Sequence, residues 1–126
     1  MLWEEYYDKV WDWAVSTSVR KLSQVETFGP ADEIIEVFQH IAFDDEKAAV
    51  RLIKKALAAG VKFSGDQIAE LCLICDEAII EQAVTQSSDT FTTEDLDALY
   101  GVCDEEILLE IAGKRKVPLP ESLAEF

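Results

Sequence analysis

The sequence has little positive charge and no long apolar run. Its 126 residues include 11 Lys and Arg against 26 Asp and Glu, which gives a formal net charge of −15 at pH 7. A surface of this charge repels nucleic-acid phosphates and anionic lipids, so we expect no direct nucleic-acid binding and no membrane association. The longest uninterrupted apolar run, Leu71 to Cys75, is far shorter than the roughly 20 residues that cross a bilayer.

Export signals and a disulfide framework are also not evident. The first eight residues are acidic and aromatic, whereas a signal peptide begins with a basic segment followed by about 7 to 15 apolar residues. The three cysteines cannot all pair within one chain, and an odd count suits a reducing compartment. These features predict a cytoplasmic protein.

The usual components of a catalytic site are scarce. The chain has one His, three Cys and no glycine-rich loop, so we expect neither an enzyme nor a bound cofactor. Apolar residues nevertheless make up 49% of the chain, which is enough to build a packed core despite the net charge. We therefore predict a single folded domain over residues 1–126.

An internal repeat with a spacing of 28 residues is the clearest organisational feature. Residues 63–83 align with residues 91–111 and keep the same apolar, cysteine and acidic positions in register, among them Phe63/Phe91, Ile68/Leu96, Leu71/Leu99, Cys75/Cys103, Asp76/Asp104 and Glu77/Glu105. Repeats of about 20 to 50 residues are typical of stacked supersecondary units.

Each repeat is predicted to form two short helices. Ser64 and Gln67 have the spacing of a capping box, and Thr92 and Asp95 repeat it in the next unit. Asp76 and Asp104 are natural N-caps for the second helices. Those helices each carry an apolar face that a neighbouring element must cover, formed by Ile79, Ile80, Ala83 and Val84 in one and by Ile107, Leu108, Ile111 and Ala112 in the other.

A looser unit precedes the repeats. Gly29 as N-cap with Pro30 at the first helical position opens a helix whose inward residues are Ile34, Val37, Phe38 and Ile41. A second helix is expected from Asp44 to about Ala59, ended by Gly60 at the C′ position.

The N-terminal residues are also predicted to be helical, with a break at Ser16–Ser18. We expect one buried arc there, made of Trp3, Tyr7, Val10, Trp11 and Ala14. Tyr6 and Trp13 lie off this arc and one heptad apart, so we expect them to be exposed as anchors for self-association, with a homodimer as the implied assembly.

Together these patterns predict an all-α fold, a short right-handed solenoid of about three to four stacked helical hairpins. Its expected parts are aromatic capping helices (1–27), three helical units (28–60, 61–88 and 89–117) and a tail (118–126).

Residues 28–113 resemble degenerate ankyrin repeats. The resemblance rests on the segment from Asp44 to Gly60, followed by Phe63 to Val84, because the second helix of an ankyrin repeat commonly ends in paired apolar residues and a glycine. The spacing of 28 is shorter than the usual 33 or so, and the Thr-Pro-Leu-His signature is absent. The resemblance implies plain helix–turn–helix units without the β-hairpin finger, and a protein-binding function without chemistry.

Cys72, Cys75 and Cys103, with His40, suggest an alternative function as a metal-binding or redox protein. Zinc requires four convergent ligands, whereas Cys75 and Cys103 occupy equivalent inward positions where a small apolar residue is expected. The Cys72–Cys75 pair also lies late in its predicted helix, away from the N-terminus that stabilises a redox thiolate. We therefore interpret the cysteines as buried structural thiols and predict no metal site.

The strongest indication of function is a long segment that contains acidic residues but no basic ones. Residues 63–113 contain 13 Asp and Glu and no Lys or Arg. Eight of these acids fall at predicted helix starts or caps, where the helix dipole favours them. The remaining five are candidate contacts for a basic protein partner: Glu70, Glu81, Asp89, Asp97 and Glu110. We therefore expect a non-enzymatic protein–protein interaction module, or more narrowly an inhibitor or immunity protein against a basic toxin or nuclease.

Overall fold

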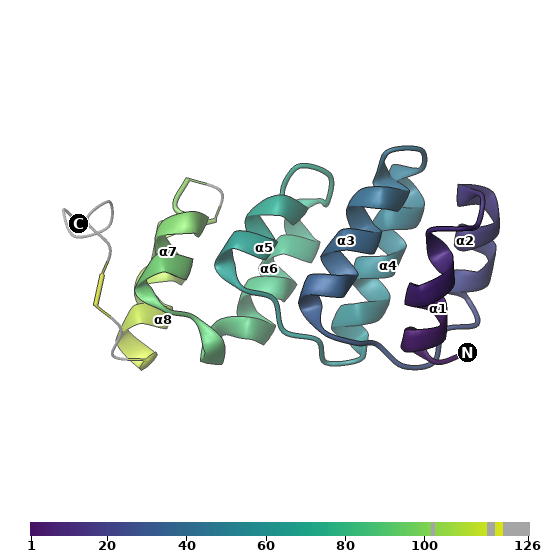
Figure 1. Ribbon diagram of the computed structural model, residues 1–126. Helices are drawn as coiled ribbons and strands as arrows, with labels where there is room; N and C mark the ends of the chain where they lie inside the picture. The colour runs from purple at the N-terminus through teal and green to yellow at the C-terminus, as the bar shows by residue number, and fades with distance from the viewer. Residues whose placement is uncertain (102, 116–117, 120–126) are drawn as a thin grey trace. The chain divides into compact units, whose positions relative to one another are not determined.

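A computed structural model of the protein describes residues 1–101, 103–115 and 118–119. Within these ranges the fold is all-α, as predicted, with eight α-helices, one 3-10 helix and no strand (Figure 1). The predicted tail lies outside the described residues, except for Pro118 and Leu119. The helices are α1 (Trp3–Val10), α2 (Val15–Leu22), α3 (Ala31–Ala42), α4 (Glu46–Ala58), α5 (Gly65–Leu71), α6 (Glu77–Ser87), η1 (Ser88–Thr90), α7 (Thr93–Leu99) and α8 (Glu105–Arg115).

The chain divides into two compact units, Met1–Val61 and Lys62–Phe126. The first unit contains α1 to α4, and the second contains α5 to α8 with η1. The division falls one residue after Gly60, where the first helical unit was expected to end. No helix among the described residues has both the length and the apolar character needed to span a membrane.

The break between the first two helices lies earlier than predicted. Helix α1 ends at Val10 and α2 begins at Val15, so Ser16–Ser18 lie in the first turn of α2. Ala14 precedes α2 in an extended conformation. The Ser18 hydroxyl donates to the Ala14 carbonyl at 3.3 Å, a bond to the preceding turn that lets serine sit within a helix.

The predicted buried arc of α1 is also wrong in part. Trp3, Tyr6 and Val10 are buried, whereas Trp11 and Ala14 are exposed. Because the helix ends at Val10, its periodicity does not extend to residues 11 and 14. Within the helix, the spacing of three and then four residues selects Tyr6 for the core.

Helices α3 and α4 form a hairpin as predicted. The four expected inward residues of α3, Ile34, Val37, Phe38 and Ile41, are all buried. Asp45 caps α4 by accepting the Ala48 N–H at 3.1 Å. Gly60 follows the helix with a φ of 89°, the left-handed conformation that favours glycine.

The N-cap of α3 is Pro30 rather than Gly29. Gly29 instead provides space for packing, since a Cβ at this position would lie 2.2 Å from Cδ1 of the Trp3 ring. The Trp3 indole N–H donates to Oε1 of Glu33 at 3.0 Å, which fixes the ring against this turn.

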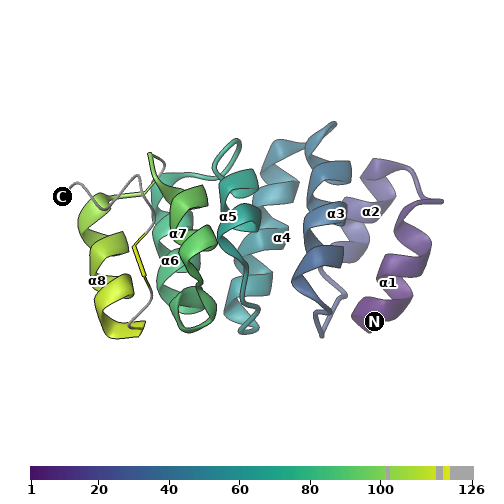
Figure 2. The same ribbon diagram turned by 60° about the vertical axis from the view of Figure 1, so that its left-hand side comes forward.

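The second unit reproduces the 28-residue repeat in its helix bounds. Helix α7 begins and ends 28 residues after α5, and α8 begins and ends 28 residues after α6. Both predicted capping boxes are present, at Ser64 and Thr92. Helix α5 packs against α7 within this unit (Figure 2).

The second helices of the repeat also start and pack as predicted. Asp76 accepts the Ile79 N–H at 3.1 Å, and Asp104 accepts the Glu106 N–H at 2.9 Å. All the expected core residues of these two helices are buried except Ile107, which is half-buried. Local capping and periodicity together therefore define this unit.

Candidate functional site

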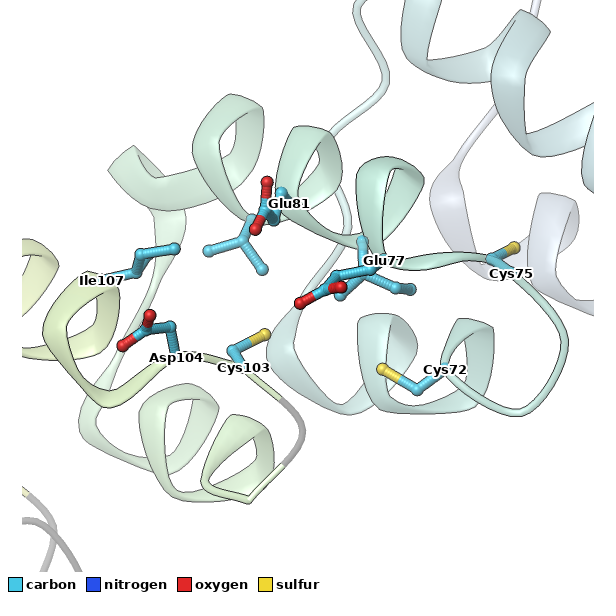
Figure 3. A pocket seen from close by; sticks show the side chains of 9 residues that line it. Cys72, Cys75, Glu77, Glu81, Cys103, Asp104 and Ile107 are labelled. Carbon is cyan, nitrogen blue, oxygen red and sulfur yellow. The ribbon is translucent and has the colours of Figure 1, made fainter.

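A pocket of about 360 Å³ opens in the Lys62–Phe126 unit. Its volume lies in the lower part of the range of roughly 300 to 1,000 Å³ that is typical of ligand sites. The turn after α5, one face of α6, and the turn before α8 with the first turn of that helix form its walls (Figure 3). The lining residues are Cys72, Cys75, Glu77, Ile80, Glu81, Val84, Cys103, Asp104 and Ile107.

Helix α6 supplies one continuous stripe of this lining. Counted from Glu77, the other lining residues of this helix follow after three, four and seven positions (Ile80, Glu81 and Val84). All four therefore share one face of the helix. Ile80 and Val84 are buried, whereas both glutamates are exposed. The stripe therefore has an apolar side that packs inward and a carboxylate side that meets solvent.

The opposite wall comes from the second copy of the repeat. Cys103 and Asp104 belong to the turn before α8, and Ile107 lies in the first turn of that helix. Asp104 is already engaged, because its carboxylate caps α8. Among the described residues, neither Glu77 nor Glu81 belongs to an ion pair, so their charge is not compensated within the described part of the unit.

All three cysteines line the pocket, and none of them forms a disulfide. Cys75 is buried as predicted, but Cys72 and Cys103 are only half-buried because the pocket opens onto them. Figure 3 shows the sulfur atoms of Cys72 and Cys103 pointing toward one another. Both thiols retain contact with the pocket space, which sequence periodicity alone did not indicate.

The pKa values of two of these thiols are displaced upward. Burial raises the pKa of Cys103 to about 11, and the nearby Cys72 and Glu81 add to the effect. Burial also raises the pKa of Cys72. Both thiols are therefore protonated at neutral pH. Because the thiolate is the form that acts as nucleophile and metal ligand, they are weakly reactive.

The residues proposed for metal binding do not form a recognisable metal centre. No group of three or more His, Cys, Asp and Glu side chains in the described ranges could hold a metal ion. His40 lies in α3, and its ring makes an edge-on contact with Trp11 at a centroid distance of 5.0 Å.

The five predicted partner-binding acids are all exposed, but they are distributed over the second unit. Glu81 is the one that lines the pocket. Asp89 forms an ion pair with Lys62, and Glu110 pairs with Lys114 at 3.3 Å, one helical turn away. Glu70 lies on α5 and Asp97 on α7.

Glu77 and Asp104 line the pocket but were not predicted as site residues. Both were attributed to helix starts, and the structure does place them there. The available signal for Glu77 was its spacing of four residues from Glu81, which puts two carboxylates on one face.

The expected exposure of Tyr6 is wrong. The side chain is buried, its hydroxyl donates to the Ser18 carbonyl at 2.9 Å, and burial raises its pKa to about 12. Trp13 is half-buried and contacts the Tyr6 ring at a centroid distance of 5.8 Å. Tyr6 therefore belongs to the core of the first unit and cannot serve as a surface anchor.

Comparisons with protein-family models, with curated proteins and with solved structures give no significant match. The function of the pocket and of the surface around it is therefore inferred from their own chemistry.

Proposed function

We propose that this protein is a non-enzymatic protein–protein interaction module, and that its Lys62–Phe126 unit presents an acidic surface to a basic partner. The supporting observation is the charge distribution. Residues 1–61 contain 11 acidic and 7 basic residues, whereas residues 62–126 contain 15 acidic and 4 basic residues. The five candidate partner contacts lie within residues 63–113 but outside the α-helix starts and caps, and all five have exposed side chains.

The positions of these acids argue against a purely structural role. Glu70 and Asp97 lie in the last turns of α5 and α7, where the helix dipole disfavours a negative charge. The last turns of α5, α6 and α7 contain no basic residue, although Lys or Arg would be favoured there. A basic partner would bring positive charge to helix ends that contain no Lys or Arg of their own.

Such a surface acts mainly on the rate and specificity of association. Complementary charge attracts the partner over distances of about a Debye length and disfavours acidic competitors. The prediction is therefore an interaction that weakens as salt is added.

Capture from a lysate of the source organism at low and high salt, with mass spectrometry of the retained proteins, tests this proposal. We expect a basic protein that is retained at low salt and released at high salt. The identity of that protein also tests the narrower form of the proposal, in which the partner is a basic toxin or nuclease and this chain is its inhibitor. Retention of no basic protein at low salt would contradict the proposal.

We further propose that the hairpins stack as a short right-handed solenoid similar to degenerate ankyrin repeats, in a cytoplasmic protein. The 28-residue repetition of both helices within the second unit supports the stacking, and three cysteines that form no disulfide suit a reducing compartment. Small-angle X-ray scattering of the full chain tests the stacking, because an elongated solenoid and two independently moving units give different distributions of interatomic distance.

A further inference from the structure

We propose that the pocket on α6 receives one arginine side chain of the basic partner. This inference rests on the proposed function and specifies the chemical group that the acidic surface holds. The pocket combines an apolar interior with a carboxylate rim, and an arginine side chain has the matching arrangement of an apolar stem and a cationic end.

The interior suits the methylene stem. Ile80, Val84 and Cys75 are buried residues that present apolar surface to the pocket, and Ile107 adds a half-buried wall. An extended alkyl chain can cover this surface without leaving a polar group buried and unpaired.

The rim suits the guanidinium group. Glu77 and Glu81 lie one turn apart on α6, so two like charges repel each other across the pocket edge. Neither belongs to an ion pair among the described residues. A guanidinium group donates several hydrogen bonds in a planar fork, so it can bind carboxylates in pairs and relieve this repulsion.

The thiols make the pocket a binding site rather than a reactive one. The raised pKa values of Cys72 and Cys103 keep both sulfurs protonated at neutral pH. The rim carboxylates are therefore the charged groups of the pocket, and their sign excludes an anionic ligand.

Titration of the ¹⁵N-labelled full chain with n-butylguanidinium, followed by NMR, tests the inference. We expect chemical-shift changes concentrated at the pocket, and slower alkylation of Cys103 when the probe is present. The neutral isostere n-butylurea has the same stem without the charge, so we expect it to bind at least about tenfold more weakly. Equal binding of the two probes, or shifts spread evenly over all exposed carboxylates, would overturn the inference.

Charge-neutralising variants test whether n-butylguanidinium binds at the pocket. We expect the double variant E77Q/E81Q to bind n-butylguanidinium about tenfold more weakly than the wild type. The matched control D66N/E94Q removes the same charge from exposed positions of the second unit that neither line the pocket nor belong to the five candidate partner contacts, so it should leave the affinity within about twofold. Equal weakening by both variants would show general electrostatic attraction and contradict an arginine pocket.

The two proposals fail in distinguishable ways. If a basic partner is captured and E77Q/E81Q binds it as tightly as D66N/E94Q does, the arginine pocket is wrong while the interaction function stands. If no basic protein is captured, the proposed function itself is contradicted, whatever the small probe does.

Discussion

The backbone N–H of Gly65 donates a hydrogen bond of 2.7 Å to Oδ1 of Asp95, 30 residues along the chain. The same carboxylate also accepts the Thr92 N–H through Oδ2 at 2.8 Å, so one side chain caps its own helix and holds the start of α5. A Cβ on Gly65 would lie 2.3 Å from the Asp95 carbonyl oxygen. Glycine therefore permits the close approach of α5 and α7 that joins the two hairpins of the second unit.

Replacing Gly65 with Ala should destabilise the protein, because the methyl group would meet backbone atoms that cannot rotate away. We expect the free energy of unfolding to fall by about 1 to 3 kcal/mol in urea denaturation followed by circular dichroism. Gly113→Ala is the matched control, since a Cβ at this position in α8 meets nothing within 4 Å. That change should be neutral or stabilise by up to about 1 kcal/mol, as alanine is the better helix former. Equal effects of the two substitutions would contradict this account of the α5–α7 contact.

Replacing Ser87 with Ala should also destabilise the second unit. The Ser87 hydroxyl accepts the Phe63 N–H at 2.9 Å, and both groups are buried. Removal of the acceptor leaves a buried N–H without its partner, which typically costs about 1 to 3 kcal/mol. Thermal and urea unfolding measure the loss, with the exposed Ser16→Ala in α2 as a control expected to change stability by less than about 0.5 kcal/mol. A Ser87→Ala protein as stable as the control would contradict the assigned hydrogen bond.

Cys103 should react slowly with alkylating agents in the folded protein. Its pKa is raised from 9.0 to about 11, so the thiolate fraction at pH 8 falls by about a hundredfold relative to the unfolded chain. Alkylation by iodoacetamide, followed site by site by mass spectrometry, should be slower by about that factor than in urea. The rate should rise with pH up to about 11. A rate that levels off near pH 9 would contradict the raised pKa.

The raised pKa of Cys103 also makes the free energy of unfolding depend on pH in the alkaline range. The folded state favours the neutral thiol, so this contribution is fully present below pH 9.0 and is lost as pH rises through about 11. Cys103→Ser removes the titrating group, and we expect its unfolding free energy to fall less over this interval than that of the wild type. Identical alkaline profiles would show that Cys103 does not contribute.

Local signals made the helices of the second unit predictable. The Ser64–Gln67 and Thr92–Asp95 capping boxes each depend on residues three apart, and the structure contains both. Gly60 was likewise identifiable as a helix stop, because its positive φ is a local requirement of the chain.

Tertiary context accounts for what the sequence did not reveal. The burial of Tyr6 depends on where α1 ends, and an error of one residue in helical phase rotates a side chain by about 100°. The pocket depends on the approach of the turn at Cys103 to helix α6, two segments that the sequence relates only as members of successive repeats. Glu77 and Asp104 lie at helix starts and also line the pocket. Because the helix start already explained each acid, its place in the pocket was not predicted.

The most direct test of the acidic interaction surface is charge reversal at four exposed positions. The variant E70K/E81K/D97K/E110K and the control E5K/D8K/D12K/E26K change the net charge equally, the first in the second unit and the second in the first unit. Circular dichroism establishes that each variant keeps its helical content, and capture of the basic partner is then compared at low salt. We predict that the first variant loses most of the capture while the control retains it. Undiminished capture by the first variant, or equal loss in both, would contradict the assignment of partner binding to the acidic surface of the Lys62–Phe126 unit.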